Sequence, residues 1–113
     1  MSIKPPSKSP TANFPRAFRT ARVAVDLSQE AFDTVSSRTY VSMLERGVAQ
    51  PTLSKVDALA GVLGLHPLTL LALSYSPDPS ASGIDHVLTQ VRNEISSLAM
   101  REFSLSQRSR GKL

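Results

Sequence analysis

Between Phe14 and Ser76, apolar residues recur three or four positions apart, which is the period of an amphipathic helix. Turn and cap residues divide this stretch into five short helices. The first is marked by Phe14, Phe18, Ala21 and Val25. Because connections of two to five residues join helices of this kind into a compact bundle, the pattern predicts an all-α fold.

The next two helices are predicted mainly from their caps. Ser28 is a good N-cap for a second, short helix that ends near Val35. Ser36 or Ser37 caps a third helix, which stops at Gly47 because glycine accepts the positive φ of a helix C-terminus. These two short helices are therefore expected to be joined tightly.

The fourth and fifth helices are the most apolar. The fourth begins at Pro51-Thr52 and ends at Gly64, and its buried stripe is predicted to comprise Leu53, Val56, Leu59, Ala60 and Leu63. His66-Pro67 opens the fifth, with proline at the first helical position. Its inward-facing residues are predicted to be Leu68, Leu71 and Ala72.

A linker, "SPDPSASG" at 76–83, separates this domain of residues 14–75 from a further helix at 84–103. The apolar residues of that helix follow the 3.5-residue period of a coiled-coil seam, and they are Ile84, Leu88, Val91, Ile95 and Leu98. One helix of about 20 residues cannot bury such a stripe alone in water. It must contact its own domain, a second copy of the chain or another protein.

The charge of the chain is uneven. The chain has 113 residues, which is enough for one small domain with appendages. Its net charge is +4. We expect a disordered basic arm at 1–13 and a disordered basic tail at 104–113. Between Val23 and Tyr75 there are three basic and five acidic side chains, or −2. The basic total is therefore weak support for a nucleic-acid partner.

Several classes of function are not expected. The chain has no cysteine, which excludes disulfides and thiolate metal sites. His66 and His86 have no partner at metal-ligand spacing, and no glycine-rich phosphate loop or base beside a serine is present. No apolar run approaches the roughly 20 residues of a membrane span. We expect a cytoplasmic protein with no metal, no cofactor, no membrane partner and no enzymatic activity.

Two short helices joined tightly, the second with a polar outer face, are what a reader of the DNA major groove requires. The segments that carry a family resemblance are Arg22, "LSQE" at 27–30, "SRTYVSMLERG" at 37–47, "PTL" at 51–53 and "VDALAGVLGLHPLTLL" at 56–71. In these residues the sequence resembles the XRE family, the helix-turn-helix domain of lambda-class phage repressors and Cro proteins. The resemblance covers about Phe14 to Leu73 and implies a five-helix lambda-repressor-like domain that binds double-stranded DNA.

The resemblance also implies roles for individual residues. The positions that face bases are Gln29, Arg38, Thr39 and Met43, and Gln29 would also brace the recognition helix. The positions that meet phosphates are Ser28, Ser37, Tyr40 and Arg46. Ser28 and Ser37 are equally well explained as helix caps, and Tyr40 as a cover for the core. Arg22 and Glu45 correspond to an ion pair that ties the first helix to the end of the third.

One departure from the family concerns the turn. The span from Gln29 to Glu45 is two residues shorter than in most members, Asp33 replaces an expected alanine, and the usual glycine is missing. We expect a second helix shortened by about half a turn, with Ser36 and Ser37 as turn and cap.

The leading hypothesis is a sequence-specific transcriptional repressor that binds an inverted-repeat operator as a homodimer, held together by the stripe of the C-terminal helix. The alternative is an antitoxin-like protein. In that case the C-terminal helix binds a different protein, while the domain controls its own promoter.

Overall fold

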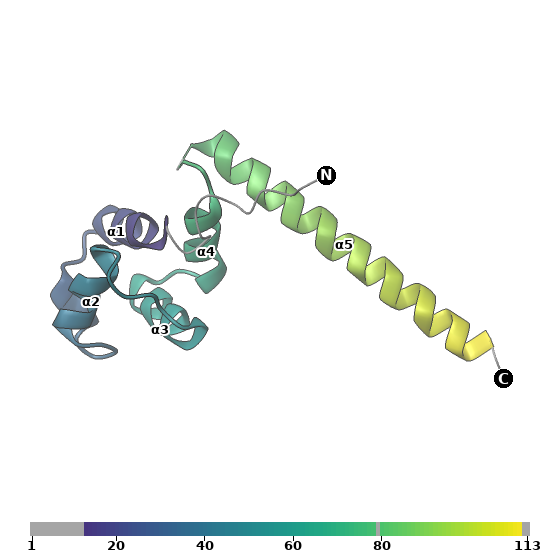
Figure 1. Ribbon diagram of the computed structural model, residues 1–113, viewed down its shortest axis with the longest axis horizontal. Coiled ribbons are helices and arrows are strands. Elements are labelled where there is room, and N and C mark those ends of the chain that lie inside the picture. The colour runs from purple at the N-terminus through teal and green to yellow at the C-terminus, as the bar shows by residue number, and fades with distance from the viewer. Residues whose placement is uncertain (1–12, 79, 112–113) are drawn as a thin grey trace.

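The computed structural model describes residues 13–78 and 80–111, and within them all regular elements are helices. They are α1 (Phe14–Ala24), the 3-10 helix η2 (Gln29–Phe32), α2 (Arg38–Glu45), α3 (Leu53–Leu63), α4 (Pro67–Tyr75) and α5 (Ala81–Gly111). Figure 1 shows α1 to α4 gathered into one body, from which α5 projects as a long rod. The all-α prediction is confirmed. The arm expected at 1–13 lies, except for Asn13, outside the described residues, as does the end of the tail at 112–113.

The core of the body lies where α1, η2, α2, α3 and α4 meet. Phe18 is fully buried at its centre, with its ring centroid 6.2 Å from that of Phe14 and 5.1 Å from that of Phe32. The buried cluster consists of Phe14, Phe18, Ala21, Phe32, Val41, Leu44, Val56, Leu59, Ala60, Leu63 and Leu70. Burying these side chains is the main force that holds the short helices together, because none of them is long enough to be stable alone.

Three residues predicted to face the core do not. Val25 lies beyond the end of α1 and is exposed. Leu53 is 74% exposed and Leu68 is 64% exposed. In α4 the buried leucine is Leu70, which lies about 200° around the helix from Leu68. Both mispredicted leucines stand in the first turn of their helix, Leu53 at the first residue of α3 and Leu68 at the second residue of α4.

The predicted starts of α3 and α4 and the predicted stops at Gly47 and Gly64 are confirmed. Thr52 caps α3 by accepting the backbone N–H of Lys55 at 3.2 Å. His66 caps α4 through Nδ1, which accepts the N–H of Leu68 at 3.0 Å. Gly47 and Gly64 have φ angles of +75° and +73°, so each lies in the left-handed region that ends a helix.

The junction between α4 and α5 is more ordered than the predicted linker 76–83. Ser76 is fully buried, and its hydroxyl donates to the carbonyl of Asp78. A Cβ atom at Gly83 would lie 3.0 Å from the Asp78 carbonyl oxygen and from Ser76 Oγ, which explains why glycine stands there. Arg16 of α1 donates to the Ser76 carbonyl at 3.0 Å. The start of α5 is thereby fastened to the body.

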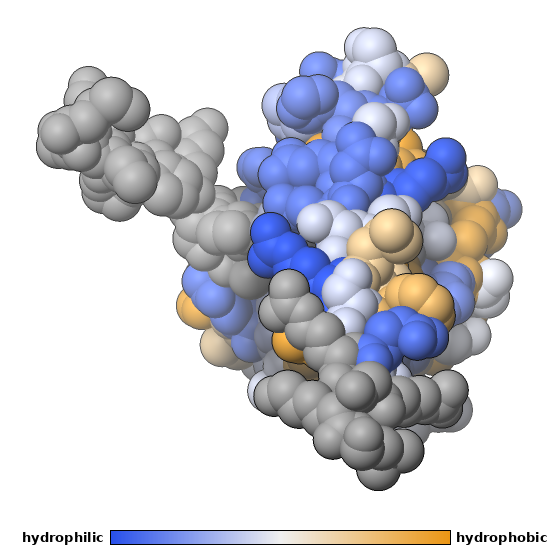
Figure 2. Space-filling model, turned by 90° about the vertical axis from the view of Figure 1, so that its right-hand side faces the viewer, coloured by the Kyte–Doolittle hydropathy of each residue, from blue (hydrophilic) through white to orange (hydrophobic). Residues whose placement is uncertain are grey.

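The helix α5 is longer than predicted. It begins at Ala81 rather than at residue 84 and continues to Gly111, so residues 104–111, expected to be part of a disordered tail, are helical. Its 31 residues extend over about 46 Å. Figure 2, the molecule seen from the right of Figure 1, shows hydrophobic side chains exposed among hydrophilic ones on this face.

Candidate nucleic-acid interface

The recognition-helix candidate, α2, is held to the body by its inner side. Val41 and Leu44 are both fully buried. At its start, Ser37 Oγ accepts the backbone N–H of Tyr40 at 3.1 Å, so the cap predicted for Ser37 is present. The opposite side of α2 carries Arg38 and Thr39, which are exposed. The helix is therefore fixed on one side and open on the other.

The ion pair predicted between Arg22 and Glu45 is present. Arg22 Nε lies 2.6 Å from Glu45 Oε2, and Nη2 donates to Oε1 at 2.9 Å. The two side chains are only 14% and 8% exposed. The hydrogen bonds that Arg22 donates to Glu45 raise the pKa of Arg22 above its ordinary value, although burial opposes this shift. A planar, two-point contact of this kind fixes the end of α2 against α1.

Gln29 is next to this ion pair and is not fully exposed to solvent. Its Nε2 donates to Glu45 Oε1 at 3.3 Å, and the side chain is partly buried. This contact with the carboxylate that ends α2 is one that a bracing residue would make, and the bracing role stays a prediction. The contact of Gln29 with DNA also stays a prediction.

Arg38 is 61% exposed, but its charge is not unopposed. Its Nη2 lies 3.0 Å from Glu30 Oε1 and 4.0 Å from Asp33 Oδ2, and both acids are exposed. Ion pairs this exposed stabilise a protein by about 1 kcal/mol at most, so Arg38 can leave them at small cost. The sequence predicted neither contact, although Asp33 is an unusual residue for the turn in this family.

Tyr40 and Met43 are partly buried, so neither is wholly available to a ligand. Tyr40 contacts the core cluster, as one of its two predicted roles required. Lys55 Nζ lies 5.2 Å from the centroid of the Tyr40 ring and donates to the Val35 carbonyl at 3.0 Å. Lys55 thus connects α3 to the turn before α2. Sequence reasoning missed it because a lone lysine in a first turn carries no signal of such a contact.

The remaining predicted phosphate ligands are exposed. Ser28 occupies the N-cap position of η2, but its side chain makes no capping hydrogen bond, so the cap predicted there is wrong in that respect. Arg46 follows directly after α2 and is also exposed. Ser28, Ser37 and Arg46 are therefore all exposed to solvent, the two serines before α2 in the chain and Arg46 directly after it.

The shortened turn is resolved by reducing the second helix to one 3-10 turn. Instead of continuing to Val35, η2 ends at Phe32, whose ring is fully buried and anchors it. The N–H groups of Val35 and Ser36 both donate to the Phe32 carbonyl, at 3.0 and 2.9 Å. The second helix is therefore shortened by more than the expected half turn, because the two residues absent from this span come out of the helix and not out of the turn.

The described residues offer little other chemistry. Among them, no three histidine, cysteine, aspartate or glutamate side chains gather closely enough to hold a metal ion. No single described helix has the length and apolarity of a membrane span, and the α3–α4 pair that meets these criteria jointly is bent by 109°.

The comparison with known families gives one match. Residues 18–70 fit a family model described as helix-turn-helix. The matched segment runs from α1 into α4, so it contains η2, the turn and the whole of α2. No curated protein and no solved structure matches the chain.

Proposed function

The chain belongs to the XRE family of lambda repressor/Cro-like helix-turn-helix proteins, and we propose that it is a repressor that binds an inverted-repeat operator as a homodimer. The family is one of DNA-binding transcription regulators. Repression, the form of the operator and the dimer are the parts that we propose for this chain.

The observation that carries the proposal is the contrast between the two sides of α2. Val41 and Leu44 are buried, Glu45 is locked to Arg22, and the side that bears Arg38 and Thr39 remains open. An α-helix fits the major groove, and side chains on its outer side and first turn reach base edges. A helix held rigidly from behind can present those side chains at fixed positions.

We assign base reading to Arg38, Thr39 and Met43. A guanidinium can contact both acceptors of guanine, which is worth about 1 to 3 kcal/mol of discrimination. On binding, Arg38 would exchange Glu30 and Asp33 for a base. Met43 would contact a thymine methyl with its exposed part.

Phosphate contacts come from the polar groups around this face. Ser28, Ser37, Tyr40 and Arg46 would set the register of α2 on the duplex without reading its sequence. Gln29 would contact DNA at the groove edge while it braces Glu45.

The dimer is proposed to form through the apolar stripe of α5. Its five predicted residues comprise Ile84, which is partly buried, and the exposed Leu88, Val91, Ile95 and Leu98. A two-fold dimer would present two α2 helices to successive major grooves, which lie about 34 Å apart. That arrangement requires an operator with inverted-repeat symmetry.

A different protein as the partner of α5 is the second candidate. Met100 and Phe103 are exposed on the side of α5 away from the stripe, and a two-helix dimer would leave them uncovered. Gel filtration distinguishes the candidates. A stable homodimer of the pure chain favours the repressor, whereas a monomer with a protease-sensitive α5 favours an antitoxin-like role.

The test of the DNA-reading face is Arg38→Ala, with Arg19→Ala as the matched control. Arg19 is an exposed arginine of α1 to which no DNA contact is assigned. In footprinting on DNA upstream of the protein's own gene, Arg38→Ala should lose the protected site while its melting temperature stays close to that of the parent. Arg19→Ala should keep the site. An unchanged footprint with Arg38→Ala would remove Arg38 from the reading face.

A further inference from the structure

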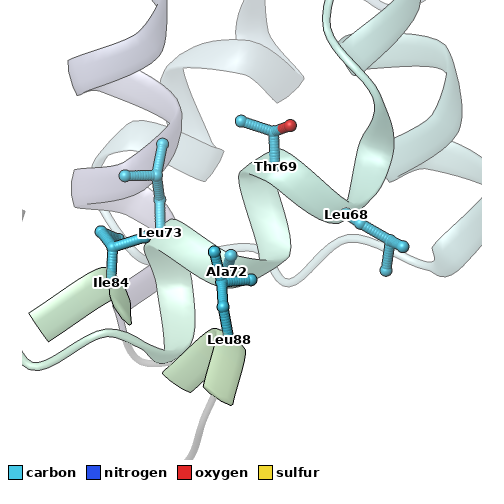
Figure 3. Close-up of a pocket in the computed structure, with 6 residues that line it drawn as sticks. All are labelled: Leu68, Thr69, Ala72, Leu73, Ile84 and Leu88. Carbon is cyan, nitrogen blue, oxygen red and sulfur yellow. The ribbon is translucent and has the colours of Figure 1, made fainter. Parts of the chain in front are cut away.

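An apolar groove lies between α4 and the start of α5. It has a volume of about 260 Å³ and is lined by Leu68, Thr69, Ala72, Leu73, Ile84 and Leu88. Figure 3 shows Ala72 and Leu73 of α4 next to Ile84 and Leu88 of α5. The leucine at the edge of this groove, Leu68, is one of the most exposed in the body.

The groove continues directly into the stripe of α5, because Ile84 and Leu88 belong to both. Further along the helix, Ile95 and Leu98 are 60% and 62% exposed. The same seven-residue period reaches Leu105, also exposed, but it places a charged residue, Glu102, in the stripe. The seam thus extends over six turns of helix with one acidic position near its end.

The charged residues beside the seam distinguish the two ways in which a pair of such helices can lie. Glu94 and Arg101 flank the seam on the same side, seven residues apart. In an antiparallel pair, equivalent flanks of the two helices face each other. Glu94 then lies opposite Arg101 of the partner subunit, and two-fold symmetry produces this contact twice.

A parallel pair loses these contacts. Its flanks face the other side of the partner helix, so that Glu94 would lie near Ala99 of the partner subunit and Arg101 near Ser106 of the partner subunit. Glu102 would also face its own copy across the seam, and like charges placed there repel. In the antiparallel pair, Glu102 lies opposite Val91 of the partner subunit.

We propose that α5 pairs antiparallel with α5 of a second copy of this chain, about a two-fold axis between Ser96 and Ser97. The proposal rests on the homodimer of the proposed function and adds its orientation and register. Ile95 contacts Leu98 of the partner subunit, and Leu88 contacts Leu105 of the partner subunit. The last turns of the partner's α5 then pass Leu88 and reach Ile84, where they cover the open mouth of the groove between α4 and α5.

This register sets the separation of the two bodies. Ile84, at the base of α5, lies opposite residue 109 of the partner, so the two copies of Ile84 are 25 residues apart along the rod. At the helical rise, this is about 37 Å. The spacing of the two α2 helices follows from this distance together with the position of α2 in each body.

Charge reversal tests the orientation. Glu94→Arg alone and Arg101→Glu alone should each weaken the full-length dimer by about tenfold, because each turns two attractive contacts into repulsive ones. The double variant, and a mixture of the two single variants, should regain dimers as tight as the parent. Sedimentation measures all four samples. Single variants that dimerise as tightly as the parent, or a mixture that regains nothing, would overturn the antiparallel register.

Cysteine cross-linking gives an independent answer, since the chain has no cysteine of its own. An equimolar mixture of Leu88→Cys and Leu105→Cys should give a disulfide-linked heterodimer under mild oxidation. Neither variant alone should cross-link, because the two copies of residue 88 lie about 25 Å apart. Self-linked Leu88→Cys would overturn the orientation and leave the homodimer and DNA reading intact. A chain that sediments as a monomer would overturn both this proposal and the proposed homodimer.

Discussion

The body buries its large apolar side chains, whereas α5 leaves most of its own exposed to solvent. In the body, Phe18, Leu44 and Leu59 are fully buried, and helices too short to be stable alone support one another. In α5, Ile95 and Leu98 are as exposed as surface residues, although their spacing is that of a buried seam. The body is complete within one chain. Beyond its start, the apolar stripe of α5 becomes buried only when another molecule covers it.

The difference also separates two tasks. Contacts within the body fix the outer face of α2, so a single chain already holds the surface that we propose to read DNA. In the proposed dimer, the spacing and symmetry of two such surfaces depend on α5, whose contact with the body is limited to its start. Changes in the body should therefore alter folding or reading, whereas changes in the rod should alter assembly.

The largest effect is expected from charges placed in the seam. Val91→Glu combined with Ile95→Glu removes four apolar side chains from a dimer, each worth about 1.5 kcal/mol or more when buried. The dimer should be lost in sedimentation, and operator binding should weaken with it. The melting temperature of the monomeric body should be retained. Persistence of the dimer in the double variant would show that another surface holds it.

A matched pair of phenylalanines tests the contrast in burial. Phe18→Ala should lower the free energy of unfolding by about 4 kcal/mol, because it opens a cavity at the centre of the core. Phe103→Ala, on the exposed outer side of α5, should change it by less than about 0.5 kcal/mol. Urea denaturation followed by circular dichroism measures both. Similar losses for the two variants would contradict the division between a packed body and an open rod.

Removing the acids beside Arg38 should have a smaller effect, on binding rather than folding. Glu30→Gln with Asp33→Asn takes two negative charges from the DNA-facing side and releases Arg38. We expect DNA binding to tighten by about threefold to tenfold at low salt, and by less as salt screens the charges. Asp57→Asn, on α3 away from α2, is the control. Binding that is unchanged or weaker would mean that the acids position Arg38 rather than restrain it.

The smallest effect concerns the junction between the two regions. Hydrogen bonds from Ser80, including its N–H at 2.8 Å, hold the pKa of Asp78 below its usual value. The resulting stabilisation is present above the ordinary aspartate pKa and is lost as the pH falls through the lowered one. Asp78→Ala should therefore melt below the parent at neutral pH, and the gap should close in acid. A gap that does not depend on pH would contradict this role.

The features that the sequence predicted are local ones. The cap at Ser37, the helix starts at Thr52 and His66 and the helix stops at Gly47 and Gly64 depend on a few neighbouring residues, so these ends could be predicted from the sequence. The ion pair of Arg22 with Glu45 was available only through the family resemblance, since the two residues lie 23 positions apart.

The features that the sequence did not predict depend on contacts between residues that are far apart in the chain. The exposure of Leu53 and Leu68 is decided by how α3 and α4 cross their neighbours. The collapse of the second helix to η2 follows from the burial of Phe32 against Phe18. The partners of Arg38 were missed for a related reason, because they lie across a turn whose geometry the sequence left undefined.

The most direct test of sequence-specific reading by a paired protein is selection of binding sites from a pool of random duplex DNA with the full-length chain. The account predicts enrichment of an inverted repeat whose half-sites are centred about one helical turn, roughly 10 base pairs, apart. Arg38→Ala should fail to enrich the same sequence. Recovery of DNA with no common sequence, or of a single unrepeated site bound by a monomer, would contradict it.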